Sequence, residues 1–329
     1  MTKKQLFLIF IILPLIVYGG AKAYLHHHIQ QLADNLVTSV SPFVKVKYGD
    51  ITTTWDGAAR IERIDITVPQ TDEVIRVAAL ELKTHNFYQL LTLGNAFEKQ
   101  ELPESLALAI KGVDLNLHSR YAEVFDEFVK KTEATNSKHT ALPDLGCGDI
   151  KLTISGFEKD LALGYDNLLA DTQFGYRHEK KGPLVFEFST TVKDMFSFEL
   201  NWALDVGDSS IMDNIRHHGA EPKLVRVSGS IVDHSYVGRL KKVCMEHNGG
   251  DMQKMLDGQM RYFTFLLTLS EQVSMEPNTD MLTEYRKFLD KPNELILAAE
   301  PRQPLDLKTV KLYKASDVPA LLNLTLQAK

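Results

Sequence analysis

The sequence predicts an α+β fold in which a single N-terminal transmembrane helix precedes a curved, mostly antiparallel β-sheet domain with packed C-terminal helices. Three observations lead to this prediction. The chain begins with a long apolar stretch, apolar and polar residues then alternate in many short segments, and apolar residues later recur every three or four positions. Strands followed by helices, rather than alternating βαβ units, are typical of the α+β class.

The apolar stretch covers residues 6–24 and follows Lys3 and Lys4. A helix of this length can almost cross a hydrocarbon core of roughly 30 Å, and basic residues before it favour a cytoplasmic amino terminus. The sequence therefore predicts a single-pass protein of the bacterial inner membrane with its C-terminal domain in the periplasm. The residues assigned to this anchor are Leu6, Ile9, Leu13, Leu15, Val17 and Tyr18.

A cleaved signal peptide is the alternative interpretation of the same stretch. The basic start, the apolar run and an Ala-x-Ala pattern that ends at Ala23 are all typical of such a peptide. Cleavage near Ala23 would release the domain into the periplasm, so both interpretations export it. The spacing of Leu25, Ile29, Leu32, Leu36 and Val40 predicts an amphipathic helix over residues 25–43.

Composition and charge indicate an ordinary globular domain after the anchor. The chain has 329 residues, of which 44% are hydrophobic and 24% charged, and its formal net charge is −6. This charge balance disfavours a nucleic-acid partner and a broad anionic-membrane footprint. We expect a β-rich subdomain over residues 44–132 and an α+β subdomain over 139–329, separated by a polar loop at 131–138.

The only two cysteines are Cys147 and Cys244. In an oxidising compartment an isolated pair is most simply a disulfide, and the alternative is two buried free thiols. The chain lacks a Cys-x-x-Cys motif, and two distant cysteines do not make a zinc site. Export therefore predicts a Cys147–Cys244 disulfide.

Period-two alternation predicts the strands, and three- or four-residue spacing predicts the helices. The predicted strands are 44–48, 51–55, 64–68, 75–82, 106–117, 150–154, 168–176, 184–188, 196–206, 225–231, 295–297, 305–312 and 322–326. The predicted helices are 87–97, 119–129, 236–244, 252–267 and 281–289. Ser119 and Asn278 are suited to cap two of these helices, and Pro292 to end the last one.

A change of alternation phase at Gly112 indicates a bulge, and repeated bulges bend a sheet. We therefore expect one apolar face that is either an open groove or a filled core. The residues predicted for this face are Ile64, Ile66, Val68, Leu106, Leu108, Ile110, Phe196, Phe198 and Leu200.

A search for reaction chemistry finds no motif with the required spacing. His178-Glu179 does not complete H-E-x-x-H, the serines near Gly229 do not fit G-x-S-x-G, and Cys147 between two glycines is better explained by a disulfide. Neither a P-loop nor a dinucleotide-binding glycine pattern is present. We therefore expect no catalytic residues, no metal site and no cofactor.

The N-terminal third resembles Gram-negative envelope proteins of the AsmA-like type and of the similar YdgA group. The resemblance rests on the order of anchor, amphipathic helix, Trp55-Asp56-Gly57 and two alternating segments, 61–68 and 75–82. It implies an inner-membrane anchor and a curved sheet whose apolar concave face carries or senses lipid. It implies no catalytic residue, and the predicted helices between Tyr236 and Leu289 depart from a pure sheet groove.

The first functional hypothesis is a non-catalytic envelope protein that binds or organises apolar ligands, with membrane lipid as the partner. The second is an assembly module that docks on another envelope protein through a sheet edge or through the helix at 25–40. The third is an exported hydrolase whose catalytic residues are scattered along the sequence.

Overall fold

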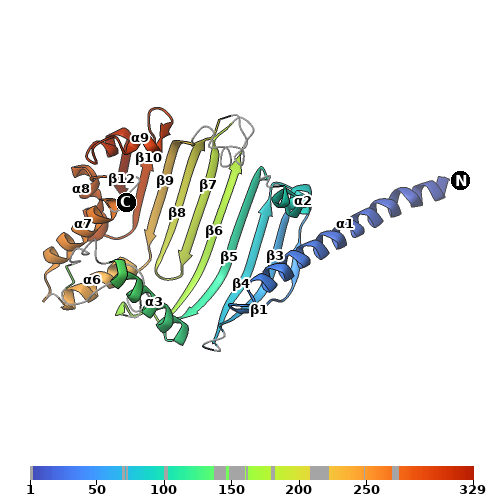
Figure 1. The fold of residues 1–329 in the computed structure, drawn as a ribbon, viewed down its shortest axis with the longest axis horizontal. Helices are drawn as coiled ribbons and strands as arrows, with labels where there is room; N and C mark the ends of the chain where they lie inside the picture. The colour runs from blue at the N-terminus through green and yellow to red at the C-terminus, as the bar shows by residue number, and fades with distance from the viewer. Residues whose placement is uncertain are drawn as a thin grey trace. The chain divides into compact units, whose positions relative to one another are not determined.

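The computed structural model describes residues 3–68, 71, 73–99, 103–136, 146–147, 160, 162–178, 182–207, 222–247, 249–268 and 274–329. Contacts within the chain define two compact units, unit 1 from Met1 to Lys111 and unit 2 from Gly112 to Lys329. The fold is α+β, and its strands pair antiparallel (Figure 1). The predicted strand at 150–154 lies outside the described residues.

Unit 1 contains helices α1 and α2 and a small antiparallel sheet. The strand order is β1-β3-β4-β5, and β2 pairs with β3 beside β1. β5 begins in unit 1 and ends in unit 2. The elements are α1 (Lys3–Val40), β1 (Lys45–Lys47), β2 (Ile51–Thr53), β3 (Ala58–Val68), β4 (Glu73–Thr84), α2 (Phe87–Glu98) and β5 (Ser105–Asn116).

The predicted transmembrane anchor is wrong. Among the residues that the structure describes, no helix combines the length and the apolar character that crossing a membrane requires. This corrects the transmembrane part of the predicted fold and the predicted single-pass inner-membrane location. The side chains of the predicted anchor residues, Leu6, Ile9, Leu13, Leu15, Val17 and Tyr18, lie outside the described part of the chain.

The physical reason lies in the composition of the part of α1 whose side chains are described. α1 is 38 residues long, which is ample for a span, but this part contains Lys22, Asp34 and the histidines at 26–28. A membrane-spanning helix needs about 20 consecutive, predominantly apolar residues. The described side chains of α1 therefore do not form the continuous apolar stretch that a span requires.

The same part of α1 packs on the sheet of unit 1 through one apolar stripe. Leu25 and Ile29 are buried and form a core cluster with Ala59 of β3 and Leu90 of α2. The predicted apolar stripe from Leu25 to Val40 is therefore buried only in its first half. In its second half, Leu36 is 61% exposed.

The Trp55-Asp56-Gly57 sequence forms the turn before β3. Gly57 has φ +86°, a left-handed conformation that glycine adopts without steric cost. Its carbonyl accepts a hydrogen bond from the Thr84 amide at 2.9 Å and lies 3.1 Å from the Thr84 hydroxyl. The Trp55 ring stacks on Phe87 at a centroid distance of 4.4 Å, so this turn joins the start of β3 to the end of β4 and the start of α2.

Unit 2 contains a larger antiparallel sheet in the order β6-β7-β8-β9-β10-β12, with β11 paired to β9. Its strands are β6 (Asn167–His178), β7 (Leu184–Val192), β8 (Phe196–Asp205), β9 (Lys223–Asp233), β10 (Glu294–Ala299), β11 (Leu305–Asp306) and β12 (Leu324–Ala328). Its helices are α3 (Arg120–Asn136), α6 (Tyr236–His247), α7 (Met252–Thr268), α8 (Thr279–Asp290), α9 (Leu307–Val310) and α10 (Val318–Leu321).

Several local predictions are confirmed in unit 2, and two are corrected. Asn278 caps α8 by accepting a hydrogen bond from the Met281 amide at 2.9 Å, as the sequence predicted. The predicted strand at 305–312 is instead the short β11 followed by α9, because Asp306 caps a helix start. α3 continues to Asn136 and covers most of the predicted loop at 131–138, of which residues 137 and 138 lie outside the described part.

Two apolar clusters pack α6 to α10 of unit 2 against its sheet. The larger cluster joins α6, α7 and α8 to β10 through residues such as Leu240, Met255, Phe288 and Leu295. The smaller cluster surrounds Val310 and Val318, which are each 1% exposed. Figure 1 shows these helices gathered beside β10 and β12, whereas no described helix crosses the middle of β6, β7 and β8.

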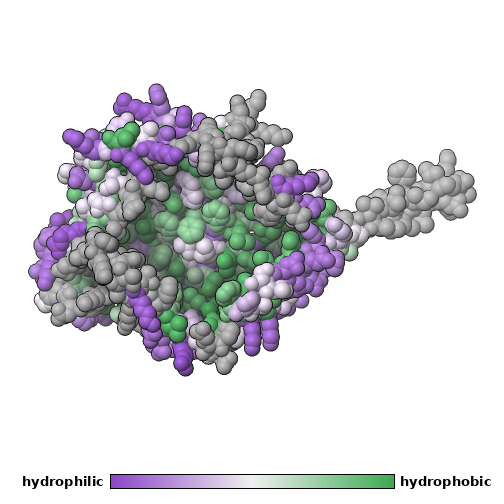
Figure 2. All heavy atoms as spheres, in the orientation of Figure 1, coloured by the Kyte–Doolittle hydropathy of each residue, from purple (hydrophilic) through white to green (hydrophobic). Residues whose placement is uncertain are grey.

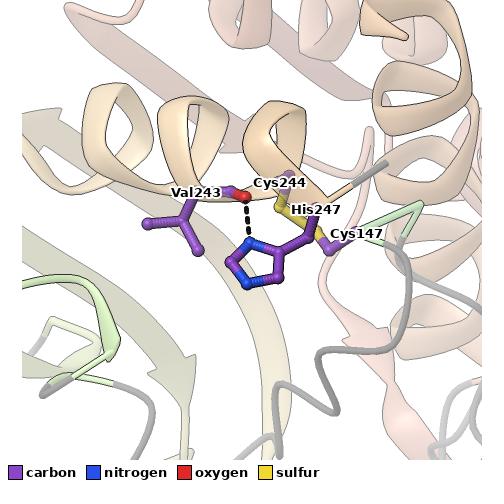
Figure 3. Close-up of a disulfide and its surroundings, with 4 residues drawn as sticks. All are labelled: Cys147, Val243, Cys244 and His247. Carbon is purple, nitrogen blue, oxygen red and sulfur yellow. Dashed lines mark hydrogen bonds between the residues drawn. A yellow bond between two sulfur atoms is a disulfide. The ribbon is translucent and has the colours of Figure 1, made fainter. Parts of the chain in front are cut away.

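Cys147 and Cys244 form the predicted disulfide, which is confirmed. Both cysteines are buried in the larger cluster, and 97 positions separate them in the sequence. Figure 3 shows His247 beside the disulfide, where its Nδ1–H donates to the Val243 carbonyl at 2.9 Å in the last turn of α6. The bond fastens residues 146–147 to α6, and a disulfide is typical of an oxidising compartment.

We expect the disulfide to be a major source of stability. The double variant Cys147→Ala/Cys244→Ala should lose about 4 kcal/mol of unfolding free energy, because a cross-link across a loop this long restricts the unfolded chain strongly. Urea unfolding followed by circular dichroism measures this loss. Reductant should destabilise the parent chain and leave the double variant unchanged; equal stability of both proteins would contradict the prediction.

We expect Gly57→Ala to destabilise unit 1 by at least about 2 kcal/mol, because left-handed backbone is unfavourable for alanine and the added carbon would need room. That carbon would lie 2.5 Å from the Asn86 carbonyl carbon. The matched control is Gly207→Ala, since Gly207 also has positive φ but has no atom within 4 Å of the added carbon. Urea unfolding should show the smaller loss for the control; equal losses would contradict the role of the close approach.

Candidate apolar binding surface

The register of β6, β7, β8 and β9 places a row of large apolar side chains on one face of unit 2. Phe174 pairs with Phe188, which pairs with Leu200, and one step along the strands Tyr176 pairs with Phe186. Side chains of paired residues point to the same face of an antiparallel sheet. We call the resulting set the aromatic surface: Phe174, Tyr176, Phe186, Phe188, Phe198, Leu200, Trp202 and Ile231.

The rings of the aromatic surface contact one another across the strands. Phe186 and Trp202 stack at a centroid distance of 5.1 Å with 14° between their planes. Phe174 lies 6.2 Å from Phe186 and 6.4 Å from Trp202, and Phe188 lies 6.0 Å from Phe198. These separations are within the range of favourable aromatic pairs, so the rings form two neighbouring groups on the same face, one around Phe186 and one of Phe188 with Phe198.

The aromatic surface is only partly covered by the rest of unit 2. Phe174 is 42% exposed and Ile231 is 37% exposed, while the other members are half-buried. Figure 2, drawn from the side of Figure 1, shows hydrophobic residues gathered over the middle of the unit 2 sheet. Large contiguous apolar patches are rare on the solvent-exposed surface of monomeric proteins, and where they occur they mark binding or interaction sites.

The same sheet face is closed at its other end. Ile231 pairs with Leu295, and Leu295 is buried beneath α7 and α8 together with Phe288 and Leu256. Phe196 also lies under this cover, with its ring edge-on to Tyr236 at 6.0 Å. The helices therefore turn one part of the face into core and leave the aromatic surface open.

Tyr176 is the one member of the surface with a hydroxyl group on its aromatic ring. Its hydroxyl is buried and has no hydrogen-bond partner among the described residues. Burial raises the pKa of Tyr176 to about 12. The folded protein keeps a proton that the unfolded chain releases near pH 10, so the contribution of Tyr176 to stability falls as the pH rises from about 10 to 12.

The opposite face of the same strands is polar. A shallow depression there is lined mainly by Gln173, Glu187, Ser189, Glu199 and Asn201. Arg177 forms an ion pair with Glu187 at 3.3 Å on this face. The alternation of β6, β7 and β8 thus separates an apolar face from a hydrophilic one.

The predicted apolar-face residues fall into three groups. Ile64, Ile66 and Val68 share one face of β3 in unit 1, and the alternate positions Leu106, Leu108 and Ile110 lie on β5, also in unit 1. In unit 2, Phe198 and Leu200 belong to the aromatic surface, whereas Phe196 packs against the helices. Of the nine residues, the structure therefore assigns only Phe198 and Leu200 to this site.

The sequence analysis did not assign Phe174, Phe186, Phe188 and Trp202 to the predicted face. Phe188 lies between Glu187 and Ser189, and each of the other three has a polar residue on one side in its own strand, so part of the signal for a half-buried strand was present. Their common location depends on how β6, β7 and β8 are paired, which alternation within one strand does not specify.

Two polar pairs in unit 2 contain residue types that take part in reaction chemistry. The Ser197 hydroxyl lies 2.9 Å from Nε2 of His234, and Nε2 of His118 lies 2.9 Å from the Asp166 carboxylate. A nucleophilic serine needs a base that a third group orients. In the described part of the chain no such group contacts the other ring nitrogen of His234, and no cluster of three metal-ligating side chains occurs there.

The chain matches no protein-family model, and comparisons with curated proteins and with solved structures find no match either. The resemblance to AsmA-like and YdgA-type proteins therefore stays a prediction. What bears on function is the geometry of the aromatic surface.

We expect Tyr176→Phe to leave the unfolding free energy unchanged or to raise it by up to about 1 kcal/mol, because it removes a buried hydroxyl without a described partner. The matched control is Tyr165→Phe. The Tyr165 hydroxyl lies 2.8 Å from the Ser235 hydroxyl, so its removal should cost about 1 kcal/mol. Urea unfolding measures both; a clear loss of stability in Tyr176→Phe would show that its hydroxyl is satisfied.

Proposed function

We propose that unit 2 binds an apolar molecule on the aromatic surface and that the acyl chain of a lipid is the class of ligand. The observation that carries the proposal is the partial exposure of neighbouring aromatic rings on a sheet face that helices cover elsewhere. Burying apolar area releases about 25 cal/mol per Å², so an acyl chain laid across several half-exposed rings gains affinity without any charged contact.

The chemistry of the surface supports an apolar ligand rather than a charged one. Its members present aromatic and aliphatic carbon, and their only side-chain polar groups are the Tyr176 hydroxyl and the Trp202 indole N–H, both uncharged. Ligand sites of this kind are lined by apolar side chains with few polar groups that fix orientation. The proposal involves binding without a reaction, since the polar pairs described above offer no basis for one.

A second candidate function is docking on another protein through unit 1. Leu36, Val40 and Phe43, near the C-terminal end of α1, are 61%, 37% and 77% exposed. Leu36 and Val40 lie on α1 and Phe43 in the turn after it, and an exposed apolar helix end of this kind fits the groove of a partner protein. This surface lies in a different unit from the aromatic surface, so the two candidates can be tested separately.

The experiment uses Trp202 as a local reporter of ligand binding. The chain contains two tryptophans, so Trp55→Phe leaves Trp202 as the only one and retains an aromatic ring on Phe87. We expect oleic acid to shift the emission of this variant to shorter wavelength and a brominated fatty acid to quench it. Native mass spectrometry of the chain purified without detergent then identifies any lipid that it carries.

A matched pair of variants, made in the Trp55→Phe background, tests the location of the site. Phe174 is partly exposed, so Phe174→Glu should fold, yet its charge would lie beside the bound chain and lower affinity at least tenfold, equivalent to about 1.4 kcal/mol. Gln173→Glu introduces the same glutamate one position earlier on β6, where the side chain lies on the polar face. This variant should leave affinity within about twofold of the parent.

Circular dichroism and urea unfolding verify that both variants are folded. No change in Trp202 emission with either fatty acid, or equal weakening by both variants, would overturn the proposal.

A further inference from the structure

The turn that follows α9 holds an apolar side chain almost fully in solvent. Leu312 is 84% exposed, more than any other large hydrophobic residue in the described part of the chain, and the neighbouring Tyr313 is 50% exposed. Single exposed apolar residues are common. Two adjacent ones at the tip of a turn need a structural reason.

The turn is firmly built, so the exposure of Leu312 does not result from a frayed segment. Val310 before it and Val318 after it are each 1% exposed and belong to the same apolar cluster. Between these anchors the Leu312 amide donates to the Thr309 carbonyl at 3.0 Å, and the Tyr313 amide donates to the Val310 carbonyl at 3.1 Å.

A contact from outside the turn fixes its second half. The Glu276 amide donates to the Ala315 carbonyl at 3.0 Å, and the Asp317 amide donates to the Lys314 carbonyl at 2.9 Å. The backbone therefore holds Leu312 outward without a described residue of its own unit to bury it. Because the backbone already holds the Leu312 side chain in one position, contact with a binding partner would cost little further conformational entropy.

The residues around Leu312 are basic. Lys308, Lys311 and Lys314 are exposed, and no acidic residue occurs between positions 307 and 316. The acidic residues on either side are engaged locally: Asp306 caps α9 through the Lys308 amide, and Asp317 accepts a hydrogen bond from Ser316. Both carboxylates keep their negative charge, so residues 306–317 carry three lysines against two aspartates and a net charge of +1, although the chain as a whole carries −6.

We propose that residues 311–314, which we call the KLYK turn, dock on the surface of a bilayer that contains anionic phospholipid. Leu312 would enter the boundary between headgroups and acyl chains, and the amphipathic ring of Tyr313 suits the same depth. Lys311 and Lys314 would lie among the anionic headgroups, with their aliphatic stems along the boundary.

The charge pattern favours such a surface over an uncharged one. Electrostatic attraction to the surface acts over a Debye length of about 8 Å at physiological salt, so the lysines beside Leu312 matter more than distant acidic residues. The proposal rests on this turn alone and does not depend on ligand binding at the aromatic surface.

The experiment places a reporter at the tip of the turn in the full chain. The native cysteines are buried in their disulfide, so the thiol of Leu312→Cys can be labelled selectively with an environment-sensitive dye. We expect the dye emission to shift to shorter wavelength with vesicles of equal parts phosphatidylglycerol and phosphatidylcholine, and not with phosphatidylcholine alone. The control is the same dye on Lys193→Cys, in the exposed turn between β7 and β8, which should show no shift.

Charge reversal tests the role of the lysines. In the labelled chain, Lys311→Glu/Lys314→Glu should weaken the apparent affinity for the anionic vesicles at least tenfold, because each lysine near such a surface contributes about a fivefold factor. Lys193→Glu, in the same labelled background, should change it by less than about twofold.

A shift of equal size with both kinds of vesicle would overturn the anionic preference, and no shift at Leu312 would overturn the docking site. Trp202 emission with fatty acid is a separate readout, so either proposal can fail without the other.

Discussion

The antiparallel register of β6 to β10 is the constraint on which unit 2 depends. Once Phe186 pairs with Tyr176 on one side and with Trp202 on the other, every second side chain of three strands is committed to the same face. A slip of one residue in any pairing would move these rings to the polar face, beside Glu187 and Glu199. The register therefore creates both the core beneath the helices and the aromatic surface.

Whether a part of this face becomes core or surface is decided by where the helices pack. α7 and α8 bring Leu256 and Phe288 over β10, and the face is closed there. Over the middle of β6 and β7 no described helix supplies such partners, and Phe174 keeps a large exposed fraction. An apolar face that is covered at one end and open at the other has the composition of a core and the accessibility of a binding site.

The disulfide and the KLYK turn show two further uses of the same packing. Cys244 reaches Cys147 from the buried side of α6, so the cross-link fastens a distant chain segment inside the larger cluster. Val310 and Val318 fix the ends of a turn whose tip leaves the Leu312 side chain exposed. In both cases a buried anchor determines the position of a segment that contributes little core of its own.

The sequence by itself determined most of the local structure, because period-two and three- or four-residue spacing are properties of neighbouring residues. The strand around Phe196 to Asp205 could be predicted in this way. The Asn278 cap of α8 was predicted from its residue type, and the Cys147–Cys244 bond from an isolated cysteine pair in a chain expected to be exported. A membrane span was predicted from an apolar composition at the start of the chain, and the described part of α1 is too polar to support it.

Only the tertiary structure decided that Phe174, Phe188 and Leu200 meet on one face, and that Phe196, four residues before Leu200, is covered. Alternation fixes which side of its own strand a residue faces, whereas cross-strand pairing and helix packing depend on contacts between residues that are distant in the sequence.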